Sequence, residues 1–155
     1  MEKKDLLKDV IKHIDIKSYN STELIDAMRN MSFTSRDTAR AADILMMMCK
    51  EKECTNILTL AGSTSAAGCM QVYVDMVRNK MIDVVVATGA SIIDMDLFEA
   101  LGFKHYIGEK ENVIADTTLR DLYIDRIYDT YIDEEELQAC DHTTFEIANM
   151  LEARP

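Results

Sequence analysis

The sequence is poor in residues that interrupt helices and strands. Its 155 residues include one proline, the terminal Pro155, and five glycines. With so few breakers, the sequence shows no linker and no low-complexity segment. Its length suits one domain with its own hydrophobic core. We therefore predict a single domain over residues 1–155, in which 1–54 form a helical lead-in and 55–155 form an α/β half.

Basic residues are scarce as well. The chain has 17 Lys and Arg against 28 Asp and Glu, which gives a formal net charge of −11. Because binding to a phosphate backbone needs a basic face, this balance argues against nucleic acid as a direct partner. The acidic run DEEEL at 133–137 is most simply a solvated helix start, where carboxylates complement the helix dipole.

Metal-binding spacings and long apolar runs are also missing. The residues to consider are Cys49, Cys54, Cys69, Cys140, His13, His105 and His142. They show no C-x-x-C pair and no zinc spacing, so we predict no metal site and reduced, buried cysteines. No stretch approaches the roughly 20 apolar residues of a membrane span, and the charged N-terminus lacks a signal-type segment. We therefore expect a soluble cytoplasmic protein with no membrane partner.

What the sequence does contain is apolar residues in regular periods, at 48% of the chain. Helical spacing predicts helices over residues 3–14, from about 22 to 28, and over 36–50. The methionines at 46–48 suit either a binding groove or core filling by a flexible side chain, and we favour core filling.

Two continuous apolar runs follow, at 56–61 and 82–88, with a helical pattern over 66–79 between them. Apolar runs without alternation suit parallel strands that are covered on both faces. A strand, a crossover helix and a strand of this length predict a right-handed βαβ unit. The patterns then predict a short helix at 94–101, a short strand at 104–108 and a closing helix at 134–151. The segment at 120–131 is ambiguous. This order indicates the α/β class with a parallel sheet.

The loop GSTSAAG follows the first predicted strand, at the end where parallel sheets gather ligands. It offers a glycine for close backbone approach, three hydroxyl groups, and helix-start N–H groups that favour an anion, at Gly62, Ser63, Thr64 and Ser65. The loop matches neither G-x-G-x-x-G nor G-x-x-x-x-G-K-[ST]. From spacing alone, a mere turn and a ligand loop are evenly matched.

The segment ATGASIIDMD after the second strand adds polar groups at the same predicted edge. Thr88, Gly89 and Ser91 begin it, and the carboxylates of Asp94 and Asp96 follow. Two carboxylates beside a small-residue loop suit ribose hydroxyls or a cationic amine. The simpler alternative, which is slightly favoured, is that one of them caps the next helix and the other is solvated. The residues alone indicate a ligand pocket of unspecified use.

At these residues the sequence resembles the deoxyhypusine synthase family, particularly its bacterial deoxyhypusine synthase-like branch. The similar features, in chain order, are MRNMSFTSRDTARAADILMMM, NILTLAGSTSAAG, MVRNKMIDVVVATGA, the pair Asp96–Leu97 before FEALGFKHYIG, and LYIDRIYDTYIDEEEL. The ordered series, rather than any one motif, carries the resemblance, and it covers nearly the whole chain.

The resemblance implies an NAD-dependent transferase with a Rossmann-like parallel sheet, typically a homotetramer with NAD sites between paired subunits. Members of the family oxidise spermidine, hold its aminobutyl group as an imine on a lysine, and pass it to a protein lysine or an amine. By position, the two NAD-contacting loops fall on Gly62, Ser63, Thr64, Ser65 and Ala66, and on Thr88, Gly89 and Ala90. The acids that meet cofactor and polyamine fall at Asp94 and Asp96, in a loop one residue longer than in eukaryotic members.

The sequence departs from the family in length. Family chains are much longer, and their imine-forming lysine lies in a second half that is missing here. Neither Lys80 nor Lys104 stands in a matching context. We therefore expect an N-terminal portion that associates with itself, with a complementary C-terminal half or with a paralogue. The alternatives are a non-catalytic partner subunit or regulator of a full-length paralogue, and a small NAD-binding domain.

Overall fold

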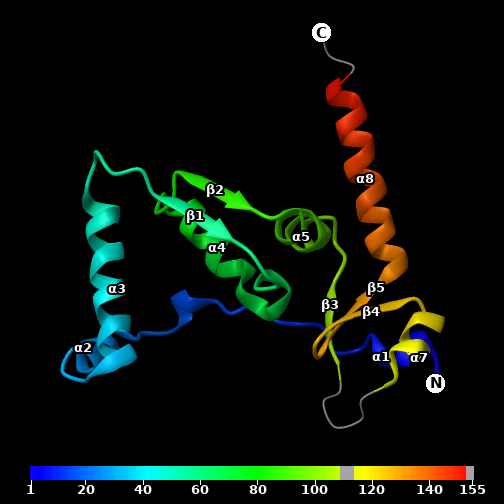
Figure 1. The fold of residues 1–155 in the computed structure, drawn as a ribbon, viewed down its shortest axis with the longest axis horizontal. Helices are drawn as coiled ribbons and strands as arrows, with labels where there is room; N and C mark the ends of the chain where they lie inside the picture. The colour runs from blue at the N-terminus through cyan, green and yellow to red at the C-terminus, as the bar shows by residue number, and fades with distance from the viewer. Residues whose placement is uncertain (109–113, 153–155) are drawn as a thin grey trace. The chain divides into compact units, whose positions relative to one another are not determined.

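The computed structural model describes residues 1–108 and 114–152 (Figure 1). The strands are β1 (Ile57–Leu60), β2 (Val84–Ala87), β3 (His105–Ile107), β4 (Ile124–Ile127) and β5 (Thr130–Asp133). The helices are α1 (Lys3–Leu6), η1 (Ile16–Ser18), α2 (Thr22–Met28), α3 (Phe33–Lys50), η2 (Ser65–Cys69), α4 (Met70–Arg78), α5 (Gly89–Ser91), η3 (Ile92–Leu97), α6 (Phe98–Ala100), α7 (Asp116–Asp121) and α8 (Glu134–Glu152). Within these described residues, no helix is both long and apolar enough to cross a membrane.

The chain forms two compact units. The first unit consists of Met1–His13, Leu60–Met70 and the described part of Ala87–Pro155. The second unit consists of Ile14–Thr59 and Gln71–Val86. Both predicted ligand loops, at 62–68 and 88–96, belong to the first unit.

Strands β1 and β2 form a parallel pair. Near its start the Asp83 N–H donates to the Asn56 carbonyl over 2.9 Å, and near its end the Thr88 N–H donates to the Leu60 carbonyl over 3.2 Å. Helix α4 connects the two strands along the chain (Figure 1). The strand–helix–strand unit predicted from the apolar runs is therefore present.

The other sheet is antiparallel, with the strand order β3-β5-β4. Its register places Ile107 opposite Thr130 and Ile124 opposite Asp133. The prediction of a parallel sheet is thus correct only for β1 and β2. Strands β4 and β5 are joined by a tight turn in which Tyr128 has a φ of 53°. Two strands connected so closely have to run antiparallel, because a parallel connection needs a long crossover.

Two apolar clusters lie on the elements that surround the antiparallel sheet. The buried residues of one cluster are Phe98, Ile132 and Cys140, and those of the other are Leu119, Ile124 and Tyr131. Strand β5 contributes the adjacent residues Tyr131 and Ile132 to different clusters. Since successive side chains of a strand point to opposite faces, both faces of β5 are covered.

The helix predicted over residues 3–14 ends at Leu6 instead. Val10 forms an antiparallel bridge with Tyr106 of β3. The Ile11 N–H donates to the His105 carbonyl over 2.9 Å. The segment is therefore extended, because its backbone groups pair with β3 rather than with one another.

Helix α3 forms close to its predicted bounds but buries little of its surface. Ala39 is its one buried residue. Met46 and Met47 are 56% and 60% exposed, so the prediction that these methionines fill a core is wrong for both. In the second unit, nothing packs over that side of the helix closely enough to bury them.

Candidate functional site

The two predicted ligand loops are joined by Ser91. Its side chain is buried, and its hydroxyl donates to the Gly62 carbonyl over 3.1 Å. The Ser91 N–H donates to the Thr88 carbonyl over 3.0 Å. Because Gly62 follows β1 and Thr88 follows β2, the carboxyl ends of the two parallel strands open at one place, as the sequence predicts.

Thr88 is the N-cap of the short helix α5. Its hydroxyl accepts the Ser91 N–H over 3.3 Å and lies 3.0 Å from the Ser91 hydroxyl. A hydroxyl at this position satisfies an N–H group that has no partner inside the helix. The capping contacts hold Gly89 and Ala90 in an exposed turn.

Gly62 and Gly89 leave open space beside the backbone. The φ of Gly62 is 77°, a conformation that residues with a Cβ rarely adopt. At both glycines, nothing lies within 4 Å of the position that a Cβ would take. A ligand can therefore approach the main chain at either residue without displacing a side chain.

Ser65 contributes a buried hydroxyl to the first loop. It is 2% exposed, and its oxygen has no hydrogen-bond partner among the residues that the structure describes. Buried hydroxyls in folded proteins are usually paired. Ala66 beside it is also buried, whereas Thr64 is exposed and Ser63 is half-buried. The loop thus presents one deep and two shallower hydroxyl groups.

Asp94 and Asp96 lie in η3 and do not share a face. Residues two apart on a helix point in different directions, and Met95 between them is buried. Burial and the nearby Asp141 carboxylate raise the pKa of Asp94. Atom Oδ1 of Asp96 is buried without a hydrogen-bond partner within the described residues. The two acids therefore form no converging pair, and each offers its carboxylate in a different setting.

The lysines with displaced pKa values do not suit imine chemistry. Hydrogen bonding to Asp75 raises the pKa of Lys17. Burial lowers the pKa of Lys3, but hydrogen bonds to Asp133 and Glu135 outweigh this effect and raise it overall. A nucleophilic lysine needs the opposite displacement. Lys80 and Lys104, which the sequence also excludes, are exposed.

The predicted absence of a metal site remains a prediction. In residues 1–108 and 114–152, no group of three or more His, Cys, Asp and Glu side chains is arranged to hold a metal ion. The four cysteines are free thiols, as predicted, but the prediction that they are buried holds for Cys140 alone, because Cys54 and Cys69 are half-buried and Cys49 is exposed.

Two groups of ionisable residues escaped sequence reasoning. Glu99 binds both His13 and His105 in the first unit. Asp125 of β4 forms a hydrogen bond with Glu134, and this bond and burial raise the pKa of Asp125 to about 6. His13 and Glu99 are separated by 86 positions, so no local spacing rule joins them. The alternation of side chains along β4, which pairs with β5, is the signal in the sequence that could have revealed the position of Asp125.

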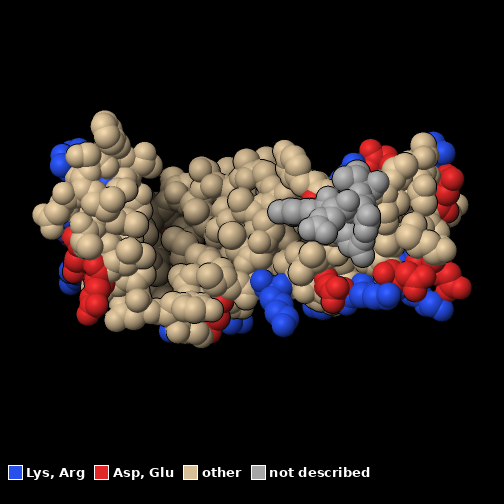
Figure 2. Space-filling view, turned by 90° about the horizontal axis from the view of Figure 1, so that it is seen from below, with Lys and Arg blue, Asp and Glu red and all other residues tan. Residues whose placement is uncertain are grey.

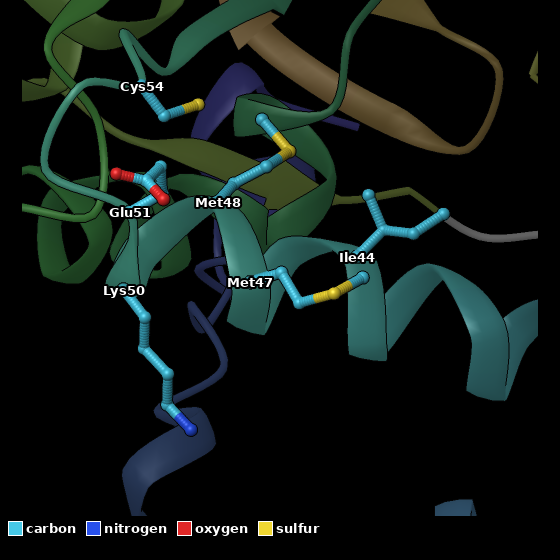
Figure 3. Close-up of a pocket in the computed structure, with 6 residues that line it drawn as sticks. All are labelled: Ile44, Met47, Met48, Lys50, Glu51 and Cys54. Carbon is cyan, nitrogen blue, oxygen red and sulfur yellow. The ribbon is translucent and has the colours of Figure 1, made fainter.

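An apolar groove lies at the end of α3 in the second unit (Figure 3). Its volume is about 580 Å³, and its lining residues are Ile44, Met47, Met48, Lys50, Glu51 and Cys54. Figure 3 shows Ile44, Met47 and Met48 projecting from α3, with Lys50 extending away from them. The groove therefore resembles a contact surface for an apolar partner more than a site for a charged ligand.

Comparisons with known proteins place the chain in a family. The model of the deoxyhypusine synthase family matches residues 23–154. A deoxyhypusine synthase-like protein of Caulobacter vibrioides is 65% identical over 153 residues, which are 99% of this chain and 41% of that protein. One from Coxiella burnetii is 60% identical, with 99% of this chain and 43% of that protein covered. A probable deoxyhypusine synthase 2 of Methanosarcina acetivorans is 36% identical, with 87% and 38% covered.

The chain spans about two-fifths of the length of these relatives, 41% of the first and 43% of the second. The matched residues include both loops that Ser91 joins and the helices that follow them. The chain therefore belongs to the deoxyhypusine synthase family.

Proposed function

We propose that this chain is the N-terminal portion of a deoxyhypusine synthase-like, NAD-dependent aminobutyl transferase. In this proposal spermidine is the donor, and a protein lysine or an amine is the acceptor. Family membership supports the reaction class. The observation that carries the cofactor assignment is the Ser91–Gly62 hydrogen bond, because it joins the two loops that correspond to the family's NAD contacts.

The residues of these loops fit a dinucleotide. Gly62 and Gly89 leave room for close approach to the backbone, and the buried Ser65 hydroxyl, which has no hydrogen-bond partner among the described residues, can donate to a ligand. A parallel strand pair with its loops at the carboxyl ends is the setting in which Rossmann-like sheets bind nucleotides. Residues 62–66 and 88–90 would hold NAD, and bound NAD would accept a hydride from the polyamine.

The acids would serve the polyamine. Asp94 and Asp96 supply carboxylates near the second loop, and a polyamine presents ammonium groups at intervals along a flexible chain. Two acids in separate settings suit two separate ammonium groups better than one. A cation beside Asp94 would also offset the burial and the repulsion from Asp141 that raise the pKa of Asp94.

The chain alone would not complete the transfer. Its pKa-displaced lysines, Lys3 and Lys17, are shifted upward by carboxylate partners and are therefore poor nucleophiles. We propose that a complementary part, equivalent to the remaining length of the relatives, supplies the imine-forming lysine. Purified chain incubated with spermidine, NAD and acceptor should yield neither deoxyhypusine nor homospermidine, and detection of either product would contradict this part of the proposal.

The second unit offers surfaces for that complementary part. Val84, Val85 and Val86 of β2 are 42%, 40% and 55% exposed, although such strands are normally covered on both faces. Ile57 of β1 and the groove at Met47 add apolar surface. Figure 2 draws the whole chain, and residues other than Lys, Arg, Asp and Glu cover much of the face that it shows. These exposures favour a chain whose apolar surface is covered by a partner. They argue against a free-standing NAD-binding domain.

Calorimetric titration with NAD tests the cofactor assignment. We expect the wild-type chain to bind NAD and Gly89→Val to bind at least about tenfold more weakly, because the new side chain fills space that the ligand needs. Gly89 lacks a positive φ, so this substitution adds little backbone strain. Gly62→Val should weaken binding through both occupied space and strain.

Gly102→Val is the matched control for Gly62→Val. Gly102 also has a positive φ, 105°, and nothing lies within 4 Å of its Cβ position, but it follows α6 and belongs to neither loop. This control should bind NAD like the wild type. Equal binding by the wild type, Gly62→Val and Gly89→Val would show that NAD does not occupy these loops.

A further inference from the structure

Three segments meet at the carboxylate of Glu99 in α6: α6 itself, the nearby strand β3 and the N-terminal segment, which is distant in the sequence. His13 Nε2 lies 2.6 Å from Glu99 Oε2, and His105 Nδ1 lies 2.7 Å from Glu99 Oε1. The His105 ring also packs against Phe98, with ring centroids 5.1 Å apart. Each oxygen of the carboxylate thus has its own imidazole partner.

The Glu99 cluster is sheltered from water. The side chains of Glu99, His13 and His105 are 8%, 18% and 0% exposed. A carboxylate this deep is costly unless hydrogen bonds replace its hydration. Burial raises the pKa of Glu99, but the hydrogen bonds from His105 and His13 outweigh burial and lower the pKa overall. The titratable groups that act on Glu99 are these two imidazoles, one from β3 and one from the N-terminal segment.

His13 ends a segment that we call the N-terminal strap, residues 9–13. The strap runs beside β3: the Ile11 N–H donates to the His105 carbonyl over 2.9 Å, and the Ile107 N–H donates to the Asp9 carbonyl over 2.7 Å. It therefore extends the antiparallel sheet by one short strand, and the imidazole of His13 fastens its end to Glu99.

The strap touches η2, which contains the end of the first loop, and α6, which follows the second loop. Gly68 in η2 has a φ of 98°, and a Cβ at this residue would lie 3.0 Å from the Lys12 carbonyl oxygen. Gly68 stands three positions after Ser65, and Glu99 stands three positions after Asp96. Lys12 of the strap thus packs against η2, while its neighbour His13 binds Glu99 of α6.

We propose that the N-terminal strap is a positioning element that holds the two loops at the separation that ligand binding needs. In this proposal the contact of ionised Glu99 with His13 fixes the end of the strap. The proposal rests on the proposed function only for the use of the loops, since the contacts themselves lie within the first unit. His13 and Glu99 are positioning residues, because they act through the helices that carry the loops.

The contact between Glu99 and His13 depends on pH, because it requires an ionised carboxylate. Ionised Glu99 accepts an N–H from each imidazole, whereas a protonated carboxyl has one oxygen that must donate. The folded-state pKa of Glu99 lies below its ordinary value of 4.5. The stabilisation is therefore present above that ordinary value and is lost as pH falls through the lower, folded-state pKa. His13 Nδ1 and His105 Nε2 are buried without hydrogen-bond partners among the described residues, so the contacts with Glu99 are the ones that hold these two rings.

Amide hydrogen exchange of the full chain tests the proposal without any ligand. The reporters for the strap are the Ile11 and Ile107 amides, and those for the loops are the Ser91 and Ala67 amides, which donate to Thr88 and Ser63. Loss of a charge-assisted hydrogen bond in His13→Gln should speed exchange at all four by at least about tenfold at neutral pH. Amides of the β4–β5 pair should be unchanged, which excludes global unfolding.

Two further variants complete the test. His142→Gln removes an exposed histidine of α8 that lies 4.0 Å from Glu146, and it should leave every reporter unchanged. Glu99→Gln should resemble His13→Gln and lose the acid-dependent deprotection that the wild type shows. If Glu99→Gln does not fold, the wild-type pH series and His13→Gln still decide.

The outcomes separate this proposal from the proposed function. Fast exchange in the strap with unchanged loop amides would overturn the positioning role. Normal protection of the Ile11 and Ile107 amides in His13→Gln would overturn the role of the Glu99–His13 contact. If the wild type fails to bind NAD while the exchange results are as expected, the cofactor assignment fails and the strap stands.

Discussion

At the scale of single residues, the chain places several carboxylates in unlike settings. Glu99 is buried between two imidazoles, Asp75 is buried beside Lys17, and Asp125 faces another acid, Glu134. The hydrogen bond from Lys17 lowers the pKa of Asp75, whereas that with Glu134 raises the pKa of Asp125. The partner therefore sets the direction of the displacement for these two aspartates, and each direction predicts its own dependence of stability on pH.

Asp125→Asn should stabilise the chain at neutral pH. The pKa of Asp125 rises to about 6 through its hydrogen bond with Glu134 and through burial. A raised acid pKa means that the folded state holds more protons than the unfolded state, so stability falls as pH rises from roughly 4 to 6. Asparagine mimics the neutral acid. After allowance for solvent screening, we expect a gain of at most about 1 kcal/mol near pH 7 and none near pH 4.

Urea unfolding near both pH values measures this gain. Asp121→Asn is the control, because the Asp121 carboxylate lies beside the Arg120 guanidinium, at 3.2 Å, instead of beside an acid. It should give no gain at neutral pH. A gain from Asp125→Asn that is equal at both pH values would exclude the shared proton as its cause.

At the residue scale, the sequence predicts that the loops with Gly62, Ser65 and Thr88 meet, because each follows one of two neighbouring strands, and the structure joins these loops through Ser91. The use of these residues as a ligand site stays a prediction. The Glu99 cluster could not be found in this way. Its members are joined by the antiparallel pairing of the N-terminal strap with β3, and that pairing is a tertiary event with no local pattern.

At the scale of elements, the largest difference from the sequence prediction is the N-terminal segment. Its apolar residues Val10 and Ile11 satisfy a helical period, yet the segment is extended beside β3. Both residues are β-branched and suit strands as well as helices, so tertiary pairing decides between them. By contrast, α8 forms over Glu134–Glu152, close to its predicted bounds, because its pattern is long and its start is acidic.

Gly68→Ala tests the contact between the strap and η2. An alanine at a φ of 98° is strained, and its Cβ would also press on the Lys12 carbonyl at 3.0 Å. We expect a loss of about 1–3 kcal/mol in the free energy of unfolding, measured with urea. Gly102→Ala, with φ 105° and open space around the Cβ position, should lose only the strain portion. Equal losses in the two variants would show that the strap does not press on Gly68.

At the scale of the whole molecule, the two units differ in how well they bury apolar side chains. The first unit has two buried clusters around its antiparallel sheet. The second unit leaves the valines of β2 and Met46 and Met47 of α3 exposed to solvent. The sequence predicted strands covered on both faces, and the residues of β2 still carry that pattern. The sequence spans 41% of the Caulobacter vibrioides relative, and we propose that the remainder of such a chain supplies the covering layers.

Reconstitution with the unmatched remainder of the Caulobacter vibrioides relative tests this difference. The two chains should co-elute in size-exclusion chromatography as a stable complex, and the complex should gain aminobutyl-transfer activity. Met47→Lys places a charge in the apolar groove and should weaken association at least about tenfold. Met31→Lys, at an exposed methionine that does not line the groove, is the control. Self-association of the chain with no uptake of the remainder would contradict the proposed partner.

The exposed valines of β2 have a consequence for the life of the chain in the cell. A short strand with apolar side chains on both faces is a template for pairing with other chains. Assembly of the chain with its proposed complement competes with aggregation, and aggregation increases with concentration. The abundance of the chain should therefore follow the supply of the complement, with the surplus removed by proteases and chaperones.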